Sequence, residues 1–399
     1  MKAWAGNLAL LGATVAGTLL VLEVGARVLY RTPGAKARRS QYLEYDPLLG
    51  WSKRPGARTL FDEPEYKVEV AINSKGLRGP ERASEPAPGV TRLLALGDSF
   101  VEGYSVPEGS TVSAQLEGDL GEKGCPSEVV NGGTSAYSTD QEYLFYESVG
   151  VSYLPKVVVL FFYYNDIVYN ALQSESGTPK PILVLRDGEL RVYRTPVERP
   201  KPVPRGKAPT SPPGLHLVLI DWIGDRLWYG APELYDRLGR LGLWEPRTRA
   251  GPPLELRVYE RTENERVEAG WEATALILDH LHRHVTERGG HFLVAYIPSR
   301  MEVDEKAWAA SRYAYPLLGP LWDRGLVGER LQELGKKDGY PVLDLRPALR
   351  GGDYFPRDGH WNASGHKAAA AAVRDFLQKE AWLPCLRPPG PPGSAAPRS

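Results

Sequence analysis

One stretch of the sequence reads Leu93-Leu94-Ala95-Leu96-Gly97-Asp98-Ser99-Phe100, so four apolar residues run directly into a glycine, an acid and a serine. An apolar run of this length, bounded by glycine, predicts a short buried strand. Open α/β sheets bind their ligands at the carboxyl ends of strands, so Ser99 is a candidate functional residue. Taken alone, the same residues fit a strand that ends in an ordinary turn serine equally well.

Strands and helices alternate along much of the chain. Besides the strand at 93–97, short apolar runs predict strands at 128–130, 156–162, 290–297 and 340–345. Periodic patterns predict helices at 111–120, 137–148, 267–288, 322–336 and 364–379. Interleaved strands and helices favour a parallel sheet that is covered on both faces. We therefore predict an α/β fold, a three-layer sandwich with a mostly parallel central sheet.

The amino terminus is apolar, with no charged residue between Lys2 and Glu23. Residues 3–22 would form a helix of about 30 Å, the thickness of a bilayer core. We predict a single transmembrane anchor at residues 1–31, and a cleaved signal peptide is the alternative. Basic residues are more numerous after this span than before it, which by itself would hold the rest of the chain in the cytoplasm. Large domains can nevertheless cross a membrane despite such flanks.

Residues 32–90 form a predicted lead-in segment, which contains a strand of period two at 66–72. Residues 91–380 form the predicted α/β domain, and residues 381–399 form a tail that is predicted to be disordered because of its proline and glycine content.

An insertion interrupts the α/β domain at about 170–260. A hairpin around Asp187-Gly188, a proline-rich stretch and a helical, aromatic-rich stretch at 215–244 replace the alternation of strands and helices there. This insertion either covers a site, meets a partner or packs as surface decoration.

The composition excludes some classes of function. Lys plus Arg and Asp plus Glu both number 49, so the 399-residue chain has no net charge and lacks the basic excess of a nucleic-acid-binding protein. The two cysteines, Cys125 and Cys385, are too few for a zinc finger or a disulfide framework. They either form one disulfide in an exported domain or remain two thiols.

A nucleophilic serine needs a base to accept its proton and an acid to orient that base. Histidine is the usual base, and the sequence has seven. His360 stands out because Asp358, two residues before it, projects to the same side of an extended loop. A metal-binding or turn-stabilising pair is the alternative. His280 and His284 would share a helix face, which we expect to be solvated; His216 and His291 have apolar surroundings typical of core or boundary residues, and His366 is expected to be structural.

The Ser99 and His360 motifs resemble the SGNH (GDSL-type) hydrolase family. Two stretches of the lead-in, Asp46-Pro47-Leu48-Leu49-Gly50-Trp51 and Ile72-Asn73-Ser74-Lys75-Gly76-Leu77-Arg78, resemble its membrane-anchored bacterial members. Gly97-Asp98-Ser99 resembles the first family block, Gly133 in Asn131-Gly132-Gly133 the second, and Asn165 in Tyr163-Tyr164-Asn165-Asp166 the third. Tyr163 replaces the glycine of the third block. Asp358-Gly359-His360 resembles the fourth, with a spacing one residue shorter than usual, as in SGNH-like proteins of polysaccharide O-acetylation.

The resemblance implies a serine esterase. Ser99 would attack an ester carbonyl, His360 would accept its proton and Asp358 would orient His360. The oxyanion would be stabilised by the N–H groups of Ser99 and Gly133 and by the amide of Asn165, at about 3–4 kcal/mol for each donor. No metal or organic cofactor is expected, and Asp98 is expected to hold the turn.

The leading hypothesis is an ester hydrolase that acts on acyl esters of a carbohydrate or cell-envelope polymer. The alternative is an O-acyltransferase with the same triad, and a third reading is a non-catalytic envelope scaffold. The resemblance also implies a membrane-bound protein whose catalytic domain lies outside the cytoplasm. The acyl group, the substrate and the oligomeric state do not follow from the sequence.

Overall fold

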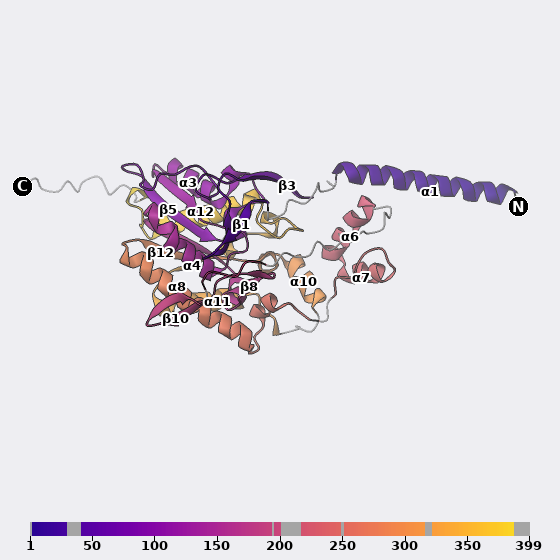
Figure 1. Cartoon of the computed structure of the whole chain (residues 1–399). Helices are drawn as coiled ribbons and strands as arrows, with labels where there is room; N and C mark the ends of the chain where they lie inside the picture. Colours follow the sequence, from indigo (N-terminus) through magenta and orange to yellow (C-terminus); the bar gives the residue numbers. More distant parts are fainter. Residues whose placement is uncertain are drawn as a thin grey trace, which may run out of the picture.

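The computed structural model describes residues 2–29, 41–193, 195–200, 217–248, 251–315 and 321–386. Its centre is a five-stranded sheet in the order β13-β12-β7-β5-β6 (Figure 1). All neighbouring strands in this sheet are parallel. In chain order, the strands are β5 (Thr91–Gly97), β6 (Ser127–Asn131), β7 (Val157–Tyr163), β12 (His291–Ile297) and β13 (Val342–Asp344). Each lies where the sequence predicts a strand.

Helices cover both faces of the sheet, because side chains alternate between the faces along each strand. Leu93 and Ala95 of β5 share one apolar core with α3 (Val112–Glu122) and α12 (Ala363–Lys379). Leu94 and Leu96 face the other core, which contains residues of α4 (Thr139–Ser148), α8 (Glu265–Glu287) and α11 (Leu326–Asp338). The predicted three-layer α/β arrangement is therefore confirmed. Three short helices, α5 (Asp166–Tyr169), α9 (Arg300–Val303) and α10 (Glu305–Ala314), complete this part of the chain.

The lead-in segment packs on the α/β domain as two hairpins. One is formed by β1 (Leu43–Asp46) and β2 (Gly50–Lys53), the other by β3 (Arg58–Asp62) and β4 (Lys67–Ala71). Trp51 Nε1 donates to the carbonyl of Ser135 at 3.0 Å, and the buried Arg78 donates to the carbonyls of Glu102 and Val106 at 2.8 and 2.6 Å. The lead-in is thus joined to the loops at the carboxyl edge of the sheet, and residues 32–40 lie outside the described ranges.

The insertion contains short strands and two helices. The strands are β8 (Ser174–Glu175), β9 (Thr178–Pro179), β10 (Leu183–Arg186) and β11 (Glu189–Val192), and the last two form the predicted Asp187-Gly188 hairpin. The helical stretch expected at 215–244 is confirmed within the described residues. It consists of two helices, α6 (Val218–Gly230) and α7 (Pro232–Arg240), because Pro232 begins a new helix rather than continuing one. Most of the proline-rich stretch lies outside the described residues.

Cys125 and Cys385 form a disulfide, which decides between the two alternatives for these residues. Cys385 belongs to a short segment after α12 in which Leu383 and Leu386 are buried. The predicted start of the tail at 381 is therefore wrong, because these side chains pack on the domain. Residues 387–399 lie outside the described part of the chain, so the prediction of disorder there remains a prediction.

The helix α1 (Lys2–Leu29) projects from one end of the molecule (Figure 1). By length and composition it is suited to be a membrane anchor or a signal sequence. Most of its described apolar side chains are exposed, although Glu23 and Ala26 near its carboxyl end are buried.

Buried carboxylates lie between α4 and α5. The pKa of Glu142 is raised well above its usual value because the residue is buried and because Asp166 and Asp98 lie nearby. Both carboxyl oxygens of Glu142 are buried without a hydrogen-bond partner among the described residues. The carboxylate of Asp140, by contrast, has a partner, because it pairs with the buried Lys180 of the insertion.

We predict that Glu142→Gln stabilises the protein at pH 8 and leaves its stability almost unchanged near pH 4. Because the folded-state pKa is raised, the unfolded chain releases this proton first as the pH rises, and stability falls with pH. The neutral amide of the Glu142→Gln variant does not titrate, so this variant avoids that fall in stability. Thermal unfolding at both pH values measures the effect, at about 2–4 °C for each kcal/mol. The exposed Glu122→Gln is the matched control, and equal midpoints for both variants at pH 8 would contradict the prediction.

Candidate active site

The nucleophile turn joins β5 to the one-turn helix α2 (Ser99–Glu102). Gly97 has a φ of +157°, and a Cβ there would lie 2.4 Å from the side chain of Val101, so a larger residue would not fit. The carboxylate of Asp98 accepts a hydrogen bond from the N–H of Phe100 at 2.8 Å and caps the helix. This confirms the expected structural role of Asp98. The turn leaves Ser99 at the carboxyl edge of the sheet, with 6% of the residue exposed.

The loop that carries Asp358 and His360 is a tight turn. Tyr354 and Trp361 pair as an antiparallel bridge, and the N–H of Phe355 donates to the carbonyl of His360 at 2.8 Å. Gly359 has a φ of +83°, which allows the chain to reverse. The expected extended loop is therefore wrong, although Asp358 still reaches His360 because the turn folds the two side chains together.

Ser99, His360 and Asp358 form a hydrogen-bonded line. Ser99 Oγ lies 2.7 Å from His360 Nε2, and His360 Nδ1 lies 2.6 Å from Asp358 Oδ1. The ionised carboxylate of Asp358 can only accept a hydrogen bond, so the proton of the neutral imidazole lies on His360 Nδ1. His360 Nε2 is then unprotonated and can accept a hydrogen bond from the Ser99 hydroxyl. This is the arrangement by which a histidine deprotonates a serine. The ring of Phe100 packs on the imidazole, with ring centroids 4.7 Å apart.

Asp358 receives further hydrogen bonds. Tyr66 of the lead-in donates to Oδ2 at 2.8 Å, and Tyr104 OH lies 3.2 Å from the same oxygen and 3.1 Å from His360 Nδ1. Burial acts to raise the pKa of Asp358, but the hydrogen bonds and charge of His360 and the hydrogen bond of Tyr66 hold that pKa below its usual value. Asp358 thus stays ionised although it is largely buried.

Glu65 holds the backbone of the same turn. Its carboxylate accepts from the N–H of Asp358 at 2.8 Å and from the N–H of Arg357 at 3.1 Å. The sequence does not single out Glu65, Tyr66 or Tyr104. Tyr66 begins the alternating strand of the lead-in, but nothing in that pattern indicates which residue it will meet so far along the chain.

The three predicted oxyanion donors differ in the hydrogen bonds that they already make. The N–H of Ser99 is at the start of α2, where helices leave donors unpaired, and it has no partner in the described part of the chain. Asn165 follows β7, which neighbours β5, and its Oδ1 is buried without a partner within the described ranges. Its Nδ2, the atom that would donate to an oxyanion, makes no hydrogen bond to another described group.

The oxyanion role of Gly133 stays a prediction, because its N–H already has an acceptor in this structure. Its N–H donates to Asn131 Oδ1 at 3.0 Å, so it is not available to an oxyanion. A Cβ at Gly133 would lie 2.3 Å from the backbone nitrogen of Glu102, so glycine is needed here for close packing against α2. Tyr163, which replaces the glycine of the third block, packs its ring on Phe100 at 4.7 Å.

The remaining histidines do not join the triad. His280 is buried, not solvated: its ring nitrogens lie 2.8 and 3.2 Å from the carbonyls of Leu276 and Gly188, because the β10–β11 hairpin covers that helix face. His291 is exposed and stacks on Trp382. His366 is buried, and burial lowers its pKa to about 3, which agrees with a structural role. His216 lies outside the described residues, which contain no cluster of potential metal ligands.

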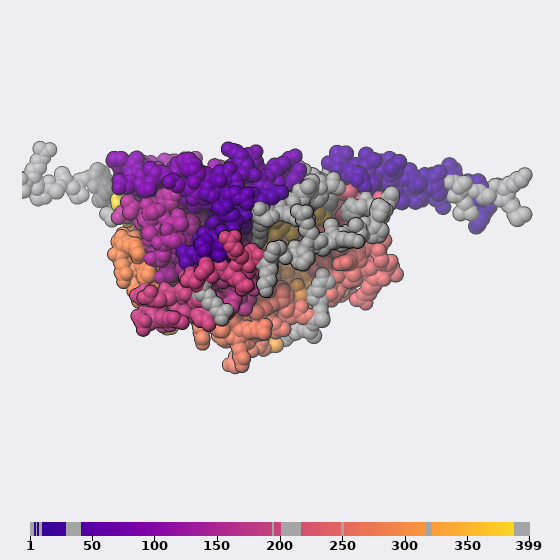
Figure 2. All heavy atoms as spheres, viewed as in Figure 1, coloured from indigo at the N-terminus to yellow at the C-terminus, as the bar shows by residue number. Residues whose placement is uncertain are grey.

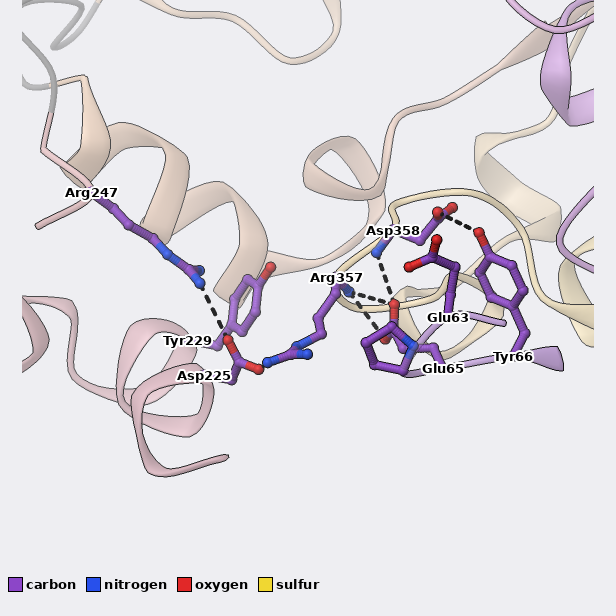
Figure 3. A pocket seen from close by; sticks show the side chains of 9 residues that line it. Glu63, Glu65, Tyr66, Asp225, Tyr229, Arg247, Arg357 and Asp358 are labelled. Carbon is purple, nitrogen blue, oxygen red and sulfur yellow. Dashed lines mark hydrogen bonds and ion pairs between the residues drawn. The ribbon is translucent and has the colours of Figure 1, made fainter. Parts of the chain in front are cut away.

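Asp358 is one of the residues that line a cleft of about 460 Å³ (Figure 3). The lead-in contributes Glu65 and Tyr66, and α6 of the insertion contributes Asp225 and Tyr229. Arg357 crosses between these walls: its side chain pairs with Asp225, and its N–H bonds to Glu65. The turn that carries Asp358 and His360 is therefore held by both the lead-in and the insertion.

Residues 257–388 match the family described as SGNH hydrolase-like domain, acetyltransferase AlgX. The match covers less than half of the chain and includes Asp358 and His360 but not Ser99. This part of the chain is thus similar to the family that the sequence motifs resemble. A comparison with curated protein sequences finds no match.

Solved structures resemble the chain only distantly. A lipase/acylhydrolase from Enterococcus faecalis is 11% identical, with 73% of this chain and 96% of that chain covered and a TM-score of 0.37. An acetyl xylan esterase is 12% identical, with 72% and 99% covered and a TM-score of 0.33. An alpha/beta hydrolase enzyme from the metagenome of Lake Arreo, Spain, is 13% identical, with 75% and 97% covered and a TM-score of 0.36. Similarities at this level carry no argument about the chain.

We predict that Tyr66→Phe lowers kcat/KM for a chromogenic ester about tenfold, the loss expected for one hydrogen bond to a charged group. Without this donor the carboxylate binds protons more tightly, so the acidic limb of the pH profile should move to higher pH. Tyr340→Phe is the control, because the buried Tyr340 hydroxyl has no partner in the part of the chain that the structure describes. A Tyr66→Phe profile that coincides with the control profile would contradict this role.

Proposed function

We propose that this SGNH hydrolase-like chain is a serine acyl-ester hydrolase. The observation that carries the proposal is the line of hydrogen bonds from Ser99 through His360 to Asp358, at 2.7 and 2.6 Å. Geometry of this kind activates a serine for attack on a carbonyl carbon. Ionised Asp358 then stabilises the imidazolium that forms in the transition state.

The reaction would proceed in two halves. Ser99 Oγ bonds to the ester carbonyl carbon while its proton moves to His360 Nε2, and His360 then gives that proton to the departing alkoxide. An acyl group remains on Ser99. Water attacks this acyl-enzyme with His360 as base, which releases the carboxylic acid and restores the serine. The N–H of Ser99 and the amide of Asn165 are the donors that the site offers to the oxyanion.

The substrate class proposed is an acyl ester of a carbohydrate or cell-envelope polymer. Support comes from the short Asp358-Gly359-His360 spacing, which resembles SGNH-like proteins of polysaccharide O-acetylation. The description of the matched family names an acetyltransferase, which also supports an acyl ester as the substrate.

An O-acyltransferase is the second candidate, because the family that matches residues 257–388 is described as an acetyltransferase. The first half of the reaction would be identical, and a sugar hydroxyl would replace water in the second half. A non-catalytic scaffold is disfavoured, because a scaffold has no need for a serine hydroxyl held 2.7 Å from an oriented imidazole.

We also propose that α1 anchors the protein in a membrane with the catalytic domain on the extracytoplasmic side. The disulfide between Cys125 and Cys385 supports this side, because disulfides persist in oxidising compartments. A carboxyl-terminal reporter fusion tests the orientation: activity of a cytoplasmic reporter would contradict it.

Labelling with a fluorophosphonate probe tests the nucleophile. Wild-type protein should be labelled, and Ser99→Ala should lose labelling completely because no activated hydroxyl remains. Ser113→Ala is the matched control, since Ser113 Oγ is buried without a partner among described residues and that variant should label normally. Labelling of Ser99→Ala at the wild-type level would show that another residue is the nucleophile.

Partition of the acyl group separates the two candidate activities. With an acyl-ester donor and an acetyl-free oligosaccharide, a hydrolase should release free carboxylic acid at the same rate with or without the sugar. Acylated sugar formed at the expense of free acid would replace the hydrolase proposal with the transferase.

A further inference from the structure

A buried glutamate joins α1 to the insertion. Glu23 Oε1 accepts from the N–H of Val218 at 3.0 Å, and Oε2 accepts from the N–H of Leu219 at 2.9 Å. These two N–H groups belong to the first turn of α6, where a helix has no internal acceptors for its donors. Arg27, one turn further along α1, pairs with the same carboxylate at 2.7 Å.

This contact satisfies polar groups of both helices. A carboxylate in an apolar helix is unfavourable in or near a bilayer unless it is paired, and free helix N–H groups are unfavourable there for the same reason. Glu23 and the start of α6 satisfy each other. The first turn of α6, Val218-Leu219-Ile220, is itself apolar. The beginning of α6 is therefore suited to the boundary at which α1 enters a membrane.

The rest of the insertion at this end exposes apolar side chains. Leu234 on α7 is exposed, the partly buried Leu238 lies one turn further on the same side, and Leu241, which follows the helix, is 79% exposed. Ile223 of α6 and Leu243 after α7 are also exposed. Figures 1 and 2 show α6 and α7 at the end of the molecule from which α1 projects. Exposed apolar groups gathered in one region are typical of an interaction surface.

We propose that α6, α7 and the turn to Leu243 lie in the interfacial layer of the bilayer that α1 enters. The occupant of the apolar surface is lipid, because Glu23 of α1 fixes the start of α6 where the membrane begins. Trp222 and Arg226, whose side chains stack at 4.2 Å, have the character of residues that prefer this layer. The binding is that of an amphipathic element lying in the membrane surface.

The surface would also place the catalytic turn near the membrane. Tyr229 of α6 donates to the carbonyl of Pro356 at 2.8 Å, and Asp225 pairs with Arg357. These residues directly precede Asp358. The membrane-bound element and the acid of the triad are thus connected through two adjacent residues. The proposal needs α1 in the membrane, but it does not depend on the reaction at Ser99.

Lipid-borne quenchers test the proposal on the full chain in phosphatidylcholine vesicles. Single variants Leu241→Cys and Ile223→Cys are labelled with an environment-sensitive fluorophore, with the native disulfide kept oxidised. Lipids that carry a nitroxide near the headgroup end of the acyl chain should quench most of the emission at both sites. Leu185→Cys is the matched control, an exposed leucine of the β10–β11 hairpin, and its label should keep its emission.

Two results would overturn the proposal. Quenching at Leu241→Cys and Ile223→Cys no greater than at Leu185→Cys would show that the surface is in water. A blue-shifted label that lipid nitroxides do not quench would show that a second copy or another protein covers the surface. Reporter orientation and probe labelling at Ser99 are read separately, so failure of the proposed function would leave this result intact.

Discussion

The hydrogen bond between Ser99 Oγ and His360 Nε2 joins residues that are 261 positions apart, and the architecture of the chain makes that contact possible. The serine is fixed by the end of β5 and by its Asp98 cap. The histidine is fixed by a turn that the bridge between Tyr354 and Trp361 closes. A hydrogen bond of 2.7 Å tolerates little error in position, so both supports must be rigid.

The turn that carries His360 is held by parts of the chain outside the sheet. Glu65 accepts its backbone N–H groups, Tyr66 bonds to Asp358, and Tyr229 of the insertion bonds to Pro356. Both segments therefore act on the site without supplying the nucleophile or the base. Burial is accompanied by opposite pKa shifts in two carboxyl groups, those of Asp358 and Glu142. Asp358 has donors and its pKa is lowered, whereas Glu142 has none within the described ranges and its pKa is raised.

The elements that the sequence predicts well are those with strong local patterns. The five strands of the sheet, the helices on its faces and the pair Asp358 and His360 all follow from periodicity, short motifs and resemblance. The helical stretch expected at 215–244 is present as two helices, which Pro232 separates. The resemblance implies an oxyanion role for Gly133, whereas in the structure Asn131 Oδ1 accepts the N–H of Gly133. Tyr66 and Glu65 could not be found, because only the three-dimensional packing of the lead-in brings them to the catalytic turn.

Identification of the acyl-enzyme tests the central claim most directly. Wild-type protein is mixed with a chromogenic acetyl ester, quenched in acid within the first turnover and digested, and the peptides are mapped by mass spectrometry. The account predicts one acetyl group, located on Ser99, and no such adduct in His360→Ala because the serine would lack its base. An acetyl group on another residue, or the same yield on Ser99 without His360, would contradict the proposed nucleophile and base.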